Sequence, residues 1–139
     1  MTETGDHPSN ATLTLGAQRF VSLTTFRRDG DPVPTTVWVA RDGDALIVLT
    51  PEGTGKLKRI ACDPRVQVVP CSRSGRIRPG DHPVDGIAEI VAGPAETQRL
   101  ANLIRRKYGL EYRLVFGIER LVARRQRPRV VLRITLTAA

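Results

Sequence analysis

The chain has 139 residues, of which 40% are hydrophobic, and its formal net charge is +8 at pH 7. This length allows one domain with a substantial core and is too short for two comfortable ones. No apolar run approaches the ~20 residues that a bilayer-spanning helix needs, which excludes an integral membrane protein of that type.

The positive charge is concentrated in the last third of the sequence. Residues 1–98 contain 11 basic and 12 acidic residues, whereas residues 99–139 contain 11 basic and 2 acidic ones, a net charge of +9. Such a segment contacts an anionic ligand, binds nucleic acid, or presents a solvated basic face with salt bridges. Nucleic acid is disfavoured, because the chain has six aromatic residues and no RNA-binding or helix-turn-helix signature.

Residues 1–12 are polar and include two acids, so we expect a disordered tail there, followed by a single domain over residues 13–139. The two cysteines suit free thiols in a cytoplasmic protein. Cys62, Cys71, Asp81 and His82 do not have a recognised zinc-site spacing, so we expect no metal.

The first half of the domain is predicted to form strands joined by tight turns. Residues 20–26 alternate large and small polar side chains, and residues 27–31 contain an Asp-Gly hairpin signal. Residues 32–40 then form the return strand, with prolines at its start, where a strand tolerates them. A second Asp-Gly turn leads into a strand over residues 45–50, which completes an antiparallel meander of three strands.

The junction over residues 50–59 joins that strand to a short helix over residues 55–63. Lys56, Lys58 and Arg59 lie in its first turns, where acidic residues are preferred. Free backbone N–H groups and the positive end of the helix dipole favour an anion there, and a phosphate would balance the cations. The alternative is a solvated turn before an amphipathic helix whose charges face water.

This junction is not a P-loop. That pattern requires Gly at the place of Thr50 and Ser or Thr at the place of Leu57.

The remaining elements continue the mixed pattern of strands and helices. Strands are predicted over residues 65–70, 83–92 and 129–136, a polar loop over 71–80, a helix over 95–108 that ends at Gly109, and a helix or a loop plus helix over 110–123. Short antiparallel strands with inserted helices indicate a mainly β (β+α) fold, a small closed barrel.

The order of several short motifs carries a family resemblance. The motifs are Leu23 to Gly30, Pro34 to Trp38, the junction from Thr50 through Lys56-Leu57-Lys58-Arg59-Ile60, Asp63 to Val66, Pro70 to Arg76 and Val84 to Ala88. In this order they resemble the FMN-binding split-barrel superfamily, which includes the pyridoxamine-phosphate oxidases. Within it, the chain is most similar to oxidoreductases that use the deazaflavin coenzyme F420.

The resemblance implies a six-to-seven-stranded antiparallel split β-barrel and a homodimer with two cofactor sites at the subunit interface. It places the cofactor ring against backbone of the second and fourth strands, and the phosphate near the junction. The residues implied to bind the cofactor are Thr35, Thr36, Val37, Trp38, Thr50, Lys56, Arg59, Pro70 and Cys71. Lys56 and Arg59 also share a helix face by their spacing, so the two arguments agree on them.

No catalytic side-chain set is present, and this fits an enzyme whose cofactor carries the hydride. We name no catalytic residue; solvent, Tyr108 and Tyr112 are open alternatives as proton donor. Trp38 is equally well explained as a core residue. The basic residues Arg73, Arg76, Arg78, Arg124 and Arg125 are candidates to contact the polyglutamate tail of the coenzyme.

The sequence thus favours an F420-dependent oxidoreductase that reduces a small organic substrate. Its rivals are an FMN-dependent oxidase or reductase of the same fold, a non-catalytic cofactor carrier, and a nucleic-acid-binding module.

Overall fold

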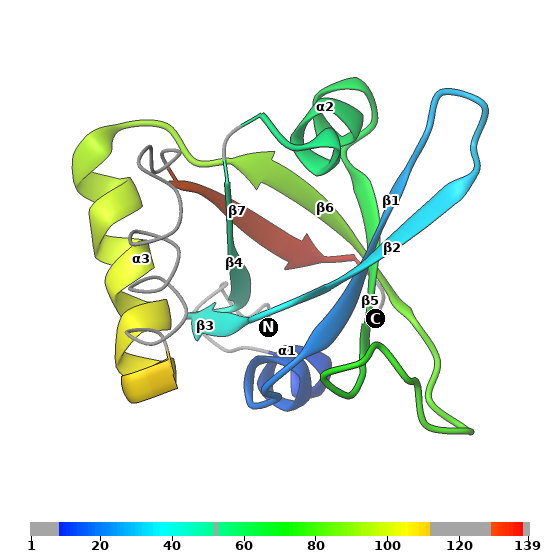
Figure 1. Cartoon of the computed structure of the whole chain (residues 1–139), viewed down its shortest axis with the longest axis horizontal. Helices are drawn as coiled ribbons and strands as arrows, with labels where there is room; N and C mark the ends of the chain where they lie inside the picture. Colours follow the sequence, from blue (N-terminus) through cyan, green and yellow to red (C-terminus); the bar gives the residue numbers. More distant parts are fainter. Residues whose placement is uncertain (1–8, 52, 112–128, 138–139) are drawn as a thin grey trace, which may run out of the picture.

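The structure, a computed structural model, describes residues 9–51, 53–111 and 129–137 (Figure 1). In this part of the chain, seven strands form one antiparallel sheet in the order β2-β1-β5-β6-β7-β4-β3. The elements are α1 (Asn10–Gly16), β1 (Val21–Phe26), β2 (Pro32–Val37), β3 (Ala40–Asp42), β4 (Ala45–Pro51), α2 (Gly55–Cys62), β5 (Arg65–Pro70), β6 (Val84–Ile90), α3 (Pro94–Tyr108) and β7 (Arg129–Leu136).

The sheet curls back on itself because its two edge strands are consecutive in the chain. Only Trp38 and Val39 separate β2 from β3, although these strands stand at opposite ends of the strand order. Figure 1 shows the resulting half-barrel, with α2 near one end and α3 packed along one side. The predicted mainly β, antiparallel split-barrel fold with inserted helices is confirmed.

The predicted three-stranded meander is wrong in one respect. Residues 32–40 form two strands, since β2 pairs with β1 and β3 pairs with β4. The strand breaks because the backbone groups of Val39 bond to side chains of α3 instead of to a neighbouring strand. The N–H donates to the Tyr108 hydroxyl, and the C=O accepts from the Lys107 ammonium. The other neighbour of β4 is β7, which pairs with it along the whole of β4.

The predicted tail over residues 1–12 also needs correction, because α1 begins at Asn10. Ser9 caps this helix by accepting a hydrogen bond from the backbone N–H of Thr12, and Thr12 is only 2% exposed. Residues 1–8 lie outside the described part, as does most of the element predicted over residues 110–123. Among the described helices, none combines the length and apolarity needed to span a bilayer.

Two apolar clusters stabilise the sheet, one on each face. The inner face of the barrel buries residues such as Leu23, Val48 and Leu132, and α2 adds Leu57 and Ile60. The outer cluster joins the sheet to α3 through Ile47, Leu100, Ile104, Tyr108 and Val131. Each fully buried side chain of this kind contributes about 1.5–3 kcal/mol relative to exposure, so α3 is held mainly by this apolar face.

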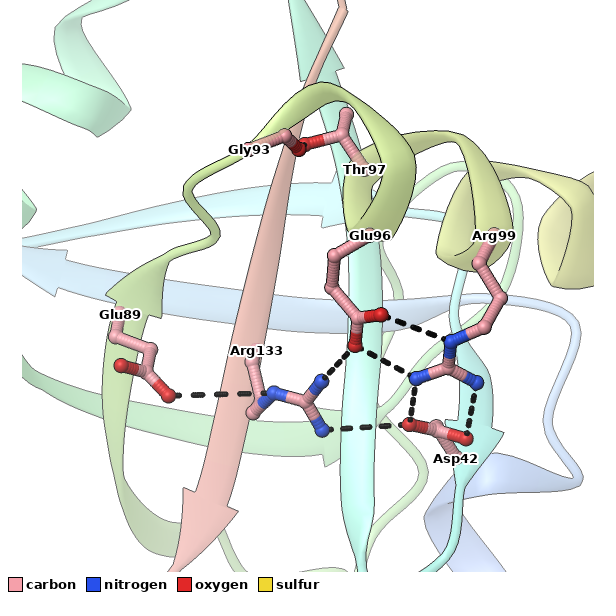
Figure 2. A network of polar contacts seen from close by, with 7 residues as sticks. All are labelled: Asp42, Glu89, Gly93, Glu96, Thr97, Arg99 and Arg133. Carbon is pink, nitrogen blue, oxygen red and sulfur yellow. Dashed lines mark hydrogen bonds and ion pairs between the residues drawn. The ribbon is translucent and has the colours of Figure 1, made fainter.

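Ion pairs fix the first turns of α3 to the sheet (Figure 2). Arg99 donates to both Asp42 and Glu96, and Arg133 of β7 donates to the same two carboxylates over 3.3 and 3.0 Å. Glu89 of β6 lies 4.0 Å from Arg133 at the margin. The Arg99 hydrogen bonds lower the pKa of Asp42 most, and Arg133 adds to the effect. The network therefore joins the β3–β4 hairpin, α3 and β7.

Candidate cofactor site

The N-terminus of α2 is left without the usual side-chain cap. After β4 the chain turns through Gly53, which has a φ of 80°, and reaches Thr54 at the N-cap. The Thr54 hydroxyl makes no capping bond, and its buried oxygen has no hydrogen-bond partner in the part of the chain that the structure describes. The first turn contains no acid. The positive end of the helix is therefore unbalanced, which favours an anion.

Arg59 lies across the first turn of α2. Its Nε donates a 2.6 Å hydrogen bond to Oγ1 of Thr25 on β1, and Thr25 is 0% exposed. A Cβ at Gly55 would lie 2.8 Å from Nη1 of Arg59, so the absence of a side chain at Gly55 makes room for the guanidinium. The sheet thus holds Arg59 beside the helix N-terminus.

Lys56 is half-buried close to Arg59. Burial lowers the pKa of Lys56, and the positive charge of Arg59 lowers it further. Among the described residues, neither cation has a carboxylate partner. Lys58, on the same helix, is exposed. The structure therefore brings Lys56 and Arg59 together as two charges that no described acid compensates.

Thr50 lies at the end of β4, opposite Val130 of β7. Thr50 is 1% exposed, and its hydroxyl oxygen has no hydrogen-bond partner among the described residues. A buried hydroxyl without a partner costs about 1–3 kcal/mol, so its presence calls for an explanation. We name Thr50, Thr54, Lys56 and Arg59 the basic corner.

The donors of the basic corner fit a phosphate group. Two hydroxyls, an ammonium, a guanidinium and the free N–H groups of a helix N-terminus all donate, and phosphate oxygens only accept. The residues present thus match the phosphorylated end of a cofactor.

A second group of predicted residues meets where β1 contacts both β2 and β5. Val21 pairs with Val37 on one side and with Pro70 on the other. The Thr36 side chain contacts Cys71, whose pKa is raised by burial and lowered to a smaller extent by this contact. Because β2 ends the sheet, its outer backbone groups have no strand partner in the described chain. This edge suits a ring held against backbone, as predicted for Thr35 to Trp38.

Not every predicted residue presents its side chain to a ligand. Val37 is buried in the barrel interior, so it offers backbone alone. Trp38 stacks on Tyr108, with ring centroids 4.4 Å apart and planes 9° from parallel, and it packs against the cluster beneath α3. The structure therefore favours the interpretation of Trp38 as a core residue.

Tyr108 is also occupied. Its hydroxyl accepts from the N–H of Val39 at 3.0 Å and donates toward the carbonyl oxygen of Arg19 at 2.8 Å. Burial raises its pKa. This environment argues against Tyr108 as proton donor. Tyr112, Arg124 and Arg125 lie outside the described residues.

The two groups stand apart along β1. Thr25 contacts the basic corner, and Val21 lies between Val37 and Pro70. Four residues of a strand span about 13 Å. The arrangement thus separates a phosphate subsite from a ring subsite.

The contact of Thr25 with Arg59 was not predicted from the sequence, in which Thr25 is first of all a strand-forming residue. One signal was available: Val21, Leu23 and Thr25 alternate, so Thr25 occupies an inward position, where a polar group requires a partner.

The curled antiparallel sheet, with α2 at its end, defines a split β-barrel. A family model described as pyridoxamine 5'-phosphate oxidase matches residues 10–139, so the chain belongs to this family. No curated protein matches the chain.

Several solved structures share the fold. An FAD-binding protein from Mesorhizobium loti superposes with a TM-score of 0.65 and 19% identity, over 92% of this chain and 86% of that one. A protein named F420 reductase gives 0.61 and 22%, over 94% and 96%. HutZ, the heme storage protein from Vibrio cholerae, gives 0.63 and 11%, over 88% and 84%. Identities this low show the fold alone.

Proposed function

We propose that the protein is an F420-dependent oxidoreductase that reduces a small organic substrate. The observation that carries this proposal is the basic corner. Within the described part of the chain, two cations without acidic partners lie at an uncapped helix N-terminus, and the buried hydroxyls of Thr50 and Thr54 have no hydrogen-bond partner. Family membership and the similarity to an F420 reductase support it. The deazaflavin, when bound, supplies hydride transfer.

The chain itself binds and orients the cofactor. Lys56 and Arg59 hold the phosphate, Thr50 and Thr54 donate to its remaining oxygens, and Thr25 keeps Arg59 in place. The outer edge of β2 faces the ring. No described side chain is assigned as proton donor, which leaves solvent and Tyr112 as the alternatives.

The proposal includes a homodimer and a cytoplasmic location. The location rests on the two free cysteines, Cys62 and Cys71. The dimer rests on the family resemblance.

An FMN-dependent oxidase or reductase is the second candidate, because the basic corner would accept the phosphate of FMN equally well. Similarity to an FAD-binding protein also favours a flavin. The two candidates share the phosphate subsite and differ in the ring.

A comparative titration tests the proposal. Purified protein is titrated with F420, FMN and FAD, and binding is followed by the change in cofactor fluorescence. We expect one F420 per chain and weaker binding of both flavins. Tight FMN binding without F420 binding would decide for the flavin enzyme. F420 binding without oxidation of the reduced coenzyme by any acceptor would indicate a carrier, and steeply salt-dependent DNA or RNA binding without cofactor would indicate a nucleic-acid module.

A further inference from the structure

A pocket of about 320 Å³ lies at the end of β5 that is distant from α2. We call it the β5-end pocket. Figure 1 shows the loop after β5 at the opposite end of that strand from α2. The lining comes from the segment before β1 and from this loop: Gln18, Pro70, Cys71, Ser72, Arg76, Ile77, Arg78, Pro79 and Asp81. Its volume falls at the small end of the range for ligand sites in proteins.

Hydrogen bonds within the loop give this pocket a defined wall. Ser72 accepts the backbone N–H of Arg76 on its hydroxyl and donates its own N–H to the Arg76 carbonyl oxygen, over 3.1 and 2.9 Å. Gly75, with a φ of 89°, turns the chain against the Thr36 hydroxyl, which a Cβ would approach to 3.0 Å. Cys71 donates its N–H to the carbonyl oxygen of Phe20. The loop is thereby pinned to both β1 and β2.

The charges of the lining are not balanced. Arg76 and Arg78 have no ion pair and no side-chain hydrogen bond with the residues that the structure describes. Arg73, in the same loop, is different, since it contacts Glu111 at 3.4 Å and lies over the Phe20 ring. Asp81 is the single carboxylate among the described lining residues, so these residues carry a net positive charge.

The rest of the lining is apolar or neutral. Ile77 is 43% exposed, and it shares the pocket lining with Pro70 and Pro79. Burial raises the pKa of the Cys71 thiol, so it stays neutral and does not cancel an arginine. An apolar wall beside two free guanidiniums matches a ligand with an apolar body and one carboxylate.

We propose that the β5-end pocket binds a small molecule that combines one carboxylate, held by Arg76 and Arg78, with an apolar body packed on Ile77. Pro70 and Cys71 belong both to this pocket and to the expected ring subsite. If the proposed function holds, the ligand lies beside the ring, at the end away from the phosphate subsite, and is the carboxylate-bearing acceptor that the enzyme reduces.

The first test needs no coenzyme. Binding of 4-fluorocinnamate and of its methyl ester is measured by ¹⁹F NMR line broadening. We expect the acid to bind and the ester, which lacks the charge, to bind at least about 5-fold more weakly. Arg76→Ala and Arg78→Ala should each weaken binding of the acid about 5- to 150-fold, as for a charge-assisted contact.

Arg106→Ala is the matched control, because Arg106 is an exposed arginine on α3 outside the pocket lining. This variant should bind the acid like the unaltered protein. Equal affinity for acid and ester, or unchanged affinity in both pocket variants, would overturn the proposal.

A second arm identifies the source of the carboxylate. The acid is titrated into protein saturated with F420 or with FMN, which has no carboxylate tail. A complex that holds both F420 and the acid supports the pocket as the acceptor site. Displacement of the acid by F420 but not by FMN would overturn that assignment, because the tail of the coenzyme would then occupy the pocket. Arginine-dependent binding of the acid in protein that binds no cofactor would support the pocket and end the proposed function. If the protein binds cofactor but binding of the acid does not depend on Arg76 and Arg78, the proposed function would stand and the pocket proposal would fall.

Discussion

Lys56→Ala and Lys58→Ala remove the same charge from the same helix, in two different environments. Lys56 is half-buried beside Arg59, with no acidic partner in the described chain, and Lys58 is exposed. A charge-assisted contact to phosphate contributes about 1–3 kcal/mol, and partial burial favours the upper half of that range. The dissociation constant of F420 should therefore rise about 30- to 150-fold in Lys56→Ala and less than about 3-fold in Lys58→Ala.

Fluorescence titration of the coenzyme at fixed ionic strength measures both constants. A thermal melt of each variant without coenzyme is the control for folding. Equal losses in the two variants would refute the reasoning, because they would show that only overall charge matters. No loss in Lys56→Ala would remove Lys56 from the phosphate subsite.

The same residue predicts a pH dependence. Burial and the charge of Arg59 lower the pKa of Lys56, so the Lys56 ammonium loses its proton at a pH below the ordinary lysine pKa of 10.5. F420 affinity should fall as the pH rises through the lowered pKa, and Lys56→Ala should remove this fall. In the protein without ligand, the pH dependence of stability has the opposite sign. Folding favours neutral Lys56, so the free energy of unfolding increases as the pH rises from the lowered pKa to 10.5. An alkaline fall in affinity that persists in Lys56→Ala would contradict this assignment.

Three further predictions concern positioning and stability. Gly55→Ala should displace the Arg59 guanidinium and weaken F420 binding about 5-fold or more. The melting temperature should change little, because the helix gain of about 1 kcal/mol from alanine opposes the loss of the bond from Arg59 to Thr25; unchanged affinity would contradict this. Asp42→Asn should lower the free energy of urea unfolding by about 1–2 kcal/mol at pH 7. This difference between variant and unaltered protein should be present above pH 3.8 and should disappear as the pH falls through the lowered pKa of Asp42. A difference that does not depend on pH would contradict the prediction. Tyr108→Phe should cost about 1–3 kcal/mol of unfolding free energy because it strands the N–H of Val39, and a cost below about 0.5 kcal/mol would show that this bond is dispensable.

Local signals predicted most of the elements. Residues 65–70 match β5, and Gly109 ends α3 with a positive φ, as expected of a C-terminal glycine. The buried side chains Leu100 and Ile104 lie on the helix face that their spacing indicates. These features depend on neighbours within a turn or a strand, and such neighbours are visible in the sequence.

The features that the sequence did not reveal depend on distant contacts. The break after Val37 reflects hydrogen bonds from Val39 to α3, 69 residues away for Tyr108. The position of Arg59 is fixed by Thr25, 34 residues earlier. The sequence did not reveal the short helix α1, because its N-cap residue, Ser9, lies in a polar segment that is typical of a tail. The cations of the candidate site were thus predictable, and their supporting contacts were not.

The central claim is that the basic corner holds the phosphate of the cofactor. The measurement that tests it most directly compares F420 with the same deazaflavin lacking the phosphate, each titrated against the unaltered protein and Lys56→Ala. We predict that removal of the phosphate and removal of Lys56 are coupled: the variant should bind the phosphate-free molecule as tightly as the unaltered protein does, while losing affinity for F420. An equal loss of affinity for both molecules would contradict the account, because Lys56 would then act on some other part of the cofactor or on the fold.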